Sequence, residues 1–207
     1  MVDNLRELGI KVVVVKGPKS IADVKENVKL IAKTLGEEDK GNLMIAKMDD
    51  KLAEIKEKVD NIKPEQRKKL VLISLMTSYG GKGCTFDDIC QYAGVINGVS
   101  DAGLHNGQIL TKEMLVAINP DLLIMPVYND HNTFDIEKYN KEFLEDPALQ
   151  TLNAVKEKRL FYPREGYIYN SSQDIVFGVQ EVARAAYGSL FDQPENCHIS
   201  VVAEVEK

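Results

Sequence analysis

The residues best suited to bind a ligand lie in loops that follow predicted strands. The first loop, residues 76–84 (MTSYGGKGC), follows the apolar run 69–75 and precedes a helix predicted to begin with Thr85 as its N-cap. Free N–H groups and the helix dipole attract anions at such a place. Tyr79 adds a ring and a hydroxyl there, and Lys82 adds a positive charge. We therefore expect Tyr79 and Lys82 to contact a ligand; a glycine-rich turn without a ligand is the alternative.

Two other chemistries compete for the same loop. The phosphate-binding pattern G-x-x-x-x-G-K-[ST] is not met, because the lysine is followed by Gly83 and no glycine occupies the required earlier position. A nucleophilic Cys84 would have its pKa lowered by the helix N-terminus, which makes a cysteine-dependent α/β enzyme the alternative function. The histidines at 105, 131 and 198 are scattered and form no recognisable signature with this cysteine. A non-enzymatic binding loop is the preferred interpretation.

Two further loops follow predicted parallel strands, and open α/β sheets bind ligands at this edge. One loop follows the apolar run 121–127 and the other is residues 163–172. An arginine there suits carboxylates or the anionic charge of a metal chelate through its bidentate fork. Polar surface turns and a surface salt bridge are the structural alternatives. The candidate ligand-binding residues in these two loops are Tyr128, His131, Arg164, Tyr167 and Tyr169.

Strands and helices alternate along the chain, which is typical of the α/β class with a parallel sheet. The predicted strands are near-continuous apolar runs at residues 10–16, 69–75 and 121–127, with a short one at 159–162. Predicted helices cover residues 21–35, 38–62, 112–118, 136–144, 147–158 and 172–187, with one more starting at 85. Ser20 and Thr111 are predicted N-caps. Residues 94–107 and 163–172 are expected to be loops, and residues 199–205 an added edge strand.

The helix at 38–62 is long and carries a narrow apolar stripe among charged residues. A stripe of this kind suits a helix that lies along other elements, and a coiled-coil interaction module is the alternative. Pro64 closes the helix and marks a plausible boundary between two lobes.

Composition excludes several classes. A net charge of −6 argues against a nucleic-acid partner, and no apolar run is long enough to cross a bilayer. Residues 1–10 lack the basic and apolar regions of an export signal. Three cysteines with no CxxC spacing indicate neither a disulfide framework nor a zinc site.

Several segments, in order, resemble one family. The segment TKEMLVAINPDLLI, with its helix, Asn-Pro-Asp stop and buried strand, is similar to a segment of substrate-binding proteins of ABC importers for iron complexes, haem and vitamin B12. Further segments that resemble this family are LGIKVVVV with SIADVKENVKLIAKTLG, YGGKGCTFDDICQYAG, LNAVKEKRLFYP and FGVQEVARAAYG. The resemblance covers roughly residues 8–188.

The resemblance implies a three-layer α/β lobe with a parallel sheet, the C-terminal lobe of a two-lobed protein joined by a long helix. It divides the chain into a remnant of the N-terminal lobe (1–37), the linking helix (38–63), the ligand-binding lobe (64–188) and a tail (189–207). The implied function is delivery of an iron or cobalt chelate (ferric siderophore, haem or cobalamin) to an ABC permease, with no cofactor of its own. Glu113 and Glu145 are candidates to meet permease arginines. The family is periplasmic or anchored to the cell surface as a lipoprotein.

In the family, more sequence precedes the segment that resembles LGIKVVVV, so the resemblance implies an N-terminally truncated chain. Residues 10–16 would then expose an apolar strand, and we expect two copies to associate through this strand or the long helix. We also expect weak ligand affinity, since half of the inter-lobe cleft would be missing.

Overall fold

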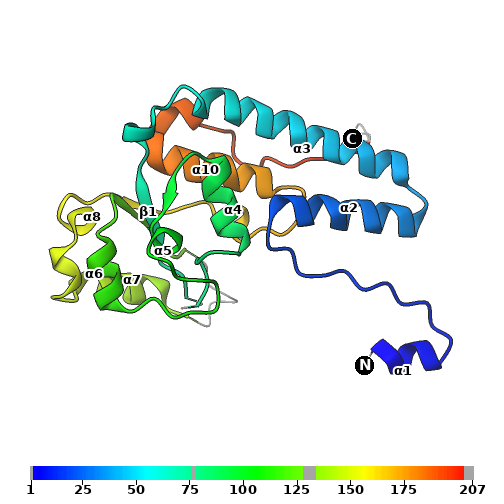
Figure 1. Cartoon of the computed structure of the whole chain (residues 1–207), viewed down its shortest axis with the longest axis horizontal. Coiled ribbons are helices and arrows are strands. Elements are labelled where there is room, and N and C mark those ends of the chain that lie inside the picture. Colours follow the sequence, from blue (N-terminus) through cyan, green and yellow to red (C-terminus); the bar gives the residue numbers. More distant parts are fainter. Residues whose placement is uncertain (1, 76–77, 128–133, 203–207) are drawn as a thin grey trace.

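A four-stranded parallel sheet forms the centre of the molecule in the computed structural model, which describes residues 2–75, 78–127 and 134–202 (Figure 1). The order of the strands is β2-β1-β3-β4, and every neighbouring pair is parallel. The strands are β1 (Lys69–Leu72), β2 (Ile96–Asn97), β3 (Leu122–Ile124) and β4 (Leu160–Phe161). The runs 69–75 and 121–127, both predicted as strands of a parallel sheet, thus contain neighbouring parallel strands, with Val71 opposite Leu123.

The two central strands are apolar on both faces, and each face supplies a separate core. Leu70 and Leu72 join one cluster, whereas Val71 and Ile73 join the other. Helices α2 (Ile21–Leu35), α3 (Glu38–Val59), α4 (Thr85–Tyr92) and α10 (Ile175–Tyr187) complete the first cluster. Helices α5 (Gly98–Asp101), α6 (Lys112–Ile118) and α8 (Asn153–Lys156) complete the second, so that the sheet lies between two helical layers (Figure 1). The predicted three-layer α/β class is confirmed.

Most predicted helices are present with small shifts at their ends. The α-helices are α1 (Val2–Glu7), α2 (Ile21–Leu35), α3 (Glu38–Val59), α4 (Thr85–Tyr92), α5 (Gly98–Asp101), α6 (Lys112–Ile118), α7 (Ile136–Glu145), α8 (Asn153–Lys156), α9 (Glu165–Ile168) and α10 (Ile175–Tyr187). Short 3-10 turns lie at Pro64–Gln66, Leu149–Thr151 and Gly188–Phe191. No helix among the described residues is long and apolar enough to cross a membrane.

Local capping signals fix several of these ends. The Ser20 hydroxyl accepts a hydrogen bond from the Asp23 N–H at 3.1 Å, and the Thr111 hydroxyl accepts one from the Met114 N–H at 3.3 Å. Both predicted N-caps are confirmed. The predicted N-cap at Thr85 is wrong by one residue, because Cys84 has the extended backbone of the cap and Thr85 is already helical.

The predicted strand at residues 10–16 is wrong. The segment is extended but unpaired, because no strand of the described chain lies beside it, and a strand exists only through its hydrogen-bonded neighbour. The described part of the predicted edge strand, residues 199–202, is also not a strand; residues 203–207 lie outside the described residues.

Two predicted loops contain regular structure. Residues 94–107 hold β2 and α5, and residues 163–172 hold α9. Conversely, the single helix predicted at 147–158 is a 3-10 turn followed by the short helix α8. These elements have two to four residues each, too few for hydrophobic periodicity to register.

Helices α2 and α3 are attached to the sheet domain by apolar and polar contacts. Ile21, Met48 and Ile55 are fully buried in the first core cluster. The two helices approach closely at Gly41, where an added Cβ would lie 2.4 Å from the Ala32 Cβ. The Asp88 carboxylate accepts a hydrogen bond from the Ile21 N–H at 2.6 Å. The apolar stripe of α3 is thus occupied within the chain, which disfavours the coiled-coil alternative.

The segment after α10 returns to the same core. Phe191 and Ile199 are buried in it, and the Lys47 ammonium of α3 donates to the Ser200 carbonyl at 2.6 Å. The division into remnant, linking helix, lobe and tail stays a prediction, although the parts predicted as remnant and tail share one core with the lobe.

Candidate functional site

Two tyrosines predicted to bind a ligand meet at the carboxyl end of β1. The rings of Tyr79 and Tyr169 lie 5.7 Å apart between centroids, with their planes inclined by 37°. The Tyr79 hydroxyl lies 2.9 Å from the Thr85 hydroxyl, and the Tyr169 hydroxyl donates to the Ser74 hydroxyl at 3.5 Å. The pair therefore stands where parallel strands deliver ligand contacts in open α/β sheets.

Burial strengthens the preference of these phenols for the protonated form, which is already the neutral-pH form of a free tyrosine. Desolvation raises the pKa of Tyr79 far above its ordinary value of 10, and it raises the pKa of Tyr169 as well. Both side chains consequently keep their protons at neutral pH. They offer uncharged aromatic rings and hydroxyl groups that can donate a hydrogen bond.

A second aromatic group, which the sequence reasoning missed, extends this edge. Tyr139 and Phe143 of α7 stack at 6.3 Å, and Phe134 lies 5.6 Å from the Tyr139 ring. The side chains of Tyr79, Tyr139 and Phe143 line one hollow of about 70 Å³ together with residues of β1 and α6. We call Tyr79, Tyr139, Phe143 and Tyr169 the aromatic edge. The i,i+4 spacing of Tyr139 and Phe143 in a predicted helix was the available signal.

Lys112 supplies a positive charge beside this hollow. Its ammonium forms an ion pair with Asp146. The Lys112 ammonium donates a hydrogen bond to the Asp146 carboxylate, which raises the pKa of Lys112 and favours its charged form. The aromatic edge thus borders a cation on a molecule that is acidic as a whole.

Two buried polar residues hold the glycine-rich loop in place. The Asn97 amide donates to the Gly80 carbonyl at 2.8 Å and to the Asp87 carboxylate at 3.0 Å, and Asp87 in turn accepts from the Gly83 N–H at 3.3 Å. A side chain at Gly81 would clash, since its Cβ would lie 2.6 Å from the His105 backbone. The loop that carries Tyr79 is therefore fixed from beneath.

Replacing Asn97 by alanine is expected to lower the free energy of unfolding by roughly 2–3 kcal/mol, because it removes an N-cap and leaves the buried Gly80 carbonyl and Asp87 carboxylate short of a donor. Denaturant unfolding measures the loss, and faster amide exchange in residues 78–84 locates it. Asn61→Ala, which removes an exposed amide–carbonyl bond to Glu57, is the control and should change stability by about 0.5 kcal/mol or less. An equal effect of both variants would contradict the anchoring role.

Cys84 does not have the environment of a nucleophile. Its thiol is buried and donates to the Gly81 carbonyl at 3.2 Å. Burial raises the pKa of Cys84, which is the opposite of the lowering that a reactive thiolate requires. The side chain also makes no capping bond at the start of α4. This geometry disfavours the cysteine-enzyme alternative.

The other predicted ligand residues do not all gather at the aromatic edge. Lys82 is exposed, and its backbone bridges the neighbouring loop by accepting from the Asn106 N–H at 2.9 Å and donating to the Leu104 carbonyl at 2.9 Å. Tyr128 and His131 lie outside the described residues. The ligand-binding roles of these three residues stay predictions.

Arg164 and Tyr167 lie in a different polar network. The Arg164 guanidinium forms an ion pair with the fully buried Glu181 at 2.7 Å and donates to the carbonyls of Gln193 and Pro194. The Tyr167 hydroxyl donates to the Cys197 carbonyl at 3.3 Å. Both side chains thus hold the segment after α10, and their predicted contact with a ligand remains untested.

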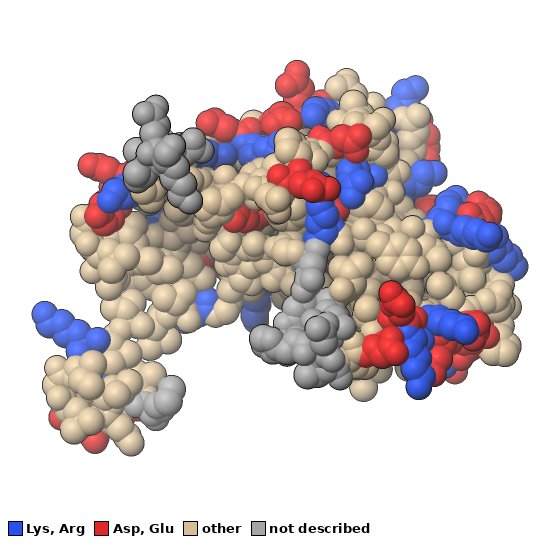
Figure 2. Space-filling view, turned by 180° about the vertical axis from the view of Figure 1, so that it is seen from behind, with Lys and Arg blue, Asp and Glu red and all other residues tan. Residues whose placement is uncertain are grey.

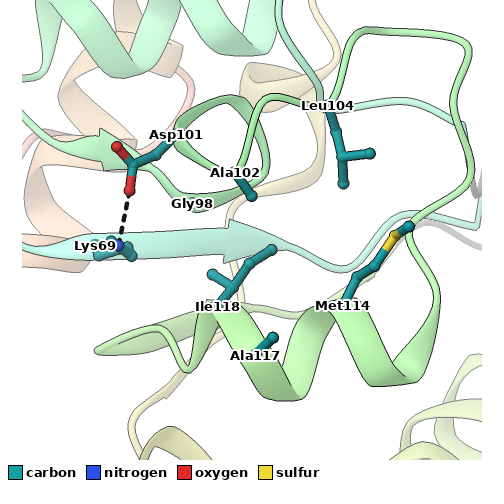
Figure 3. Close-up of a pocket in the computed structure, with 8 residues that line it drawn as sticks. All are labelled: Lys69, Gly98, Asp101, Ala102, Leu104, Met114, Ala117 and Ile118. Atoms are coloured by element: carbon teal, nitrogen blue, oxygen red, sulfur yellow. Dashed lines mark ion pairs between the residues drawn. The ribbon is translucent and has the colours of Figure 1, made fainter.

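A larger hollow lies between α5 and α6, at the amino end of β1 (Figure 3). It has a volume of about 330 Å³ and mostly apolar walls, including Leu104, Met114 and Ile118. Its one charged feature is the ion pair between Lys69 and Asp101 at 2.7 Å, in which the charges neutralise each other. None of the predicted site residues that the structure describes lines it, so the aromatic edge is the better candidate. No cluster of three or more His, Cys, Asp or Glu side chains in the described ranges is placed to hold a metal ion.

Comparison with known proteins identifies the class. Residues 2–165 match the model of the periplasmic binding protein family, and the chain belongs to this family. A relative, the uncharacterized ABC transporter substrate-binding lipoprotein YvrC of Bacillus subtilis strain 168, is 25% identical over 198 residues, which are 93% of this chain and 59% of the relative. The chain therefore spans about three fifths of the length of this curated relative. The resemblance to substrate-binding proteins of ABC importers is confirmed.

Solved structures share the fold. The periplasmic heme-binding protein RhuT from Roseiflexus sp. RS-1 matches with a TM-score of 0.75 at 18% identity, over 90% of this chain and 70% of that one. The molybdate-binding protein MolA of a Haemophilus influenzae ABC transporter matches with a TM-score of 0.73 at 15% identity, over 90% and 62% of the two chains. At these identities the matches establish the fold and leave the ligand open.

Proposed function

We propose that this chain serves an ABC importer as a solute-binding component whose ligand is a metal chelate, and that it works without covalent chemistry. The observation that carries the proposal is the aromatic edge, in which neutral tyrosine rings gather at the carboxyl end of the sheet. Aromatic walls with a few polar groups are typical of sites for organic ligands.

The structural neighbours differ in the ligands that their names give, haem for RhuT and molybdate for MolA. The side chains around the aromatic edge favour an organic metal chelate such as haem over a small oxyanion such as molybdate. A bare oxyanion needs several donors that converge on it, whereas Lys112 is paired with Asp146 and most of the surrounding side chains are aromatic or aliphatic. A chelate with a flat organic part can stack on such rings. Ferric siderophores, haem and cobalamin are the candidates.

The proposal can be tested through tyrosine fluorescence, since the chain has eight tyrosines and no tryptophan. Titration with haem, a ferric catecholate or cobalamin is expected to give saturable quenching. The dissociation constant should be weaker than about 1 µM, since the hollow at the aromatic edge has a volume of only about 70 Å³ and affinity falls when fewer contacts hold the ligand. The double variant Tyr79→Ala, Tyr169→Ala should lose this binding by at least tenfold.

Tyr92→Ala is the matched control, because Tyr92 is 41% exposed and lies at the opposite end of α4 from Thr85, the residue that contacts Tyr79. It removes the same chemical group and should leave the titration unchanged. Equal loss in both variants would contradict the assigned site. Saturable binding of molybdate with no binding of any chelate would contradict the ligand class.

The partner in transport would be an ABC permease. Glu113 in the first turn of α6 and Glu145 at the end of α7 are exposed, which agrees with their proposed role as contacts for permease arginines. Delivery to a permease would take place at the cell envelope, as the family name and the lipoprotein relative indicate.

A further inference from the structure

The amino ends of the strands carry a hollow whose walls hold several positive charges. It has a volume of about 210 Å³ and lies at the edge of the sheet opposite to the aromatic edge. Three cations line it, Lys68 directly before β1 and the consecutive Lys158 and Arg159 directly before β4. We call this site the basic hollow. Its other lining residues are Asp121, Leu122, Leu160, Phe161, Ala185 and Ala186.

The basic hollow belongs to a wider positively charged edge. Residues 67–69 (RKK) and 156–159 (KEKR) together supply six cations and one acid on a chain whose net charge is −6. Figure 1 places the start of β1 and the end of α10 on the side of the molecule away from α1, and Figure 2 shows Lys and Arg side chains gathered on that side, at the upper right of the view. Positive charge concentrated around a hollow attracts anions locally.

The two lysines of the basic hollow are not neutralised by acids. Among the residues that the structure describes, neither the Lys68 nor the Lys158 ammonium forms an ion pair. By contrast, Lys69 forms an ion pair with Asp101 at 2.7 Å (Figure 3). The acid in the wall, Asp121, accepts a hydrogen bond from the Lys69 N–H at 2.8 Å. The hollow therefore keeps an excess of positive charge.

The Arg159 guanidinium is held by one weak partner. It lies 3.3 Å from the Glu157 carboxylate, but the Glu157 side chain is 58% exposed, and an ion pair so open to water contributes little. Its Nε–H group is buried and has no acceptor. A buried donor without a partner is unfavourable, so the side chain gains by turning towards an acceptor in the hollow. Its planar fork suits phosphate and carboxylate oxygens.

Lys158 occupies a backbone conformation that favours glycine. Its φ is 54°, in the left-handed region, which a residue with a side chain adopts at a cost. The turn itself gains nothing from a lysine side chain at this position. A use of the charge accounts for the lysine better than a role in the turn does.

We propose that the basic hollow binds a phosphate group, with Lys68, Lys158 and Arg159 as its counter-charges. The volume of 210 Å³ is below the roughly 300 Å³ at which sites for drug-sized ligands begin, so the hollow suits a small group. A doubly charged phosphate matches three cations better than a single carboxylate does. The phosphate can belong to a small soluble molecule or to the headgroup of a lipid.

A role without a ligand is the structural alternative. Ala185 and Ala186 belong to the last turn of α10, and cations near the C-terminal end of a helix are favourable through its dipole. In that case the cations would stabilise the fold and would not bind phosphate more tightly than other exposed lysines do. Substitutions that separate stability from binding decide between the two roles.

A titration with inorganic phosphate at constant ionic strength, followed by proton–nitrogen NMR, tests the site. The Arg159 Nε–H and the Lys158 amide should shift saturably, whereas sodium chloride should give no saturable shift. Lys158→Gly and Lys158→Gln should both weaken binding at least about fivefold. The glycine variant should also keep or raise the urea midpoint, since glycine adopts this φ without strain. Lys33→Gln removes one exposed charge from α2 and should leave the dissociation constant unchanged.

Vesicles distinguish the two sources of the phosphate group. Sedimentation of the chain with phosphatidylcholine vesicles that contain phosphatidic acid, weakened in Lys158→Gly, would identify a lipid headgroup. Phosphate binding without such sedimentation would identify a soluble ligand, and either result supports the site. The double variant Tyr79→Ala, Tyr169→Ala should bind phosphate normally, which keeps this test separate from that of the aromatic edge. Absence of a saturable shift with phosphate, weakening by Lys158→Gly alone, or equal weakening by Lys33→Gln would overturn the proposal.

Discussion

Replacing Glu181 by alanine is expected to lower the free energy of unfolding by roughly 3–5 kcal/mol, the effect of removing one partner of a buried ion pair. Glu181 is fully buried in α10 and accepts hydrogen bonds from Arg164, Arg184 and the Gln193 amide. Without the carboxylate, two guanidinium groups lose their counter-charge in a partly desolvated place. The segment after α10 loses its attachment as well, because Arg164 also donates to the Gln193 and Pro194 carbonyls.

Urea unfolding measures this loss, and Glu157→Ala is the matched control. Glu157 pairs with Arg159 at 3.3 Å but its side chain is 58% exposed, so its removal should cost about 1 kcal/mol or less. If the two variants lost equal stability, the buried ion pairs of Glu181 would contribute no more to the free energy of unfolding than an exposed ion pair does. Amide exchange in residues 188–199 should quicken in Glu181→Ala alone.

Acid is expected to destabilise the protein through the same carboxylate. Burial by itself would raise the pKa of Glu181, but hydrogen bonds from Arg164 and Arg184 outweigh it and bring the pKa from 4.5 down to about 2. A carboxyl group with a lower pKa in the folded state binds protons more readily in the unfolded state. Its stabilising contribution is therefore complete above about pH 5 and is lost as the pH falls towards 2, about 3 kcal/mol in all.

Urea unfolding at a series of pH values from 7 to 2.5 checks this expectation. Glu181→Gln keeps the shape of the side chain but cannot titrate, so its stability should be lower at neutral pH and should fall less on acidification. If the free energy of unfolding fell equally with pH in the unmodified chain and in Glu181→Gln, other carboxyl groups would be responsible for the loss of stability in acid.

Elements with local signals could be predicted from the sequence. The bounds of α2 follow from Ser20, from the stripe that includes Val24, and from Gly36 in the left-handed conformation. The apolar runs of β1 and β3 were identifiable because both faces of a central parallel strand are buried. Short elements were missed even where a signal existed: the Asn97 side chain caps α5, and an asparagine before a glycine reads equally well as a turn.

Features that depend on distant partners could not be predicted. Residues 10–16 have every local property of a strand, but pairing is decided by what lies beside them. Tyr79 was identified from its loop, whereas Tyr139 lies inside the predicted helix 136–144 and was not identified, since nothing in the sequence places α7 at the end of β1. Arg164 was predicted to bind a ligand from its place in a loop. Its ion pair with buried Glu181 could not be foreseen, because the two residues are 17 positions apart in the sequence.

The apolar character of β1 and β3 on both faces has a consequence for how the two strands align. A strand with one polar face cannot shift its register by one residue without burying polar side chains. These two strands would bury apolar side chains in either register. Here the correct register is favoured by polar contacts at the amino ends of the two strands. The Lys69 N–H donates to the Asp121 carboxylate at 2.8 Å, and the Asp121 N–H donates to the Lys69 carbonyl at 2.7 Å. A shift in register would leave these hydrogen-bonding groups without partners. The pair of hydrogen bonds between Lys69 and Asp121 therefore sets the register of two strands that are otherwise apolar.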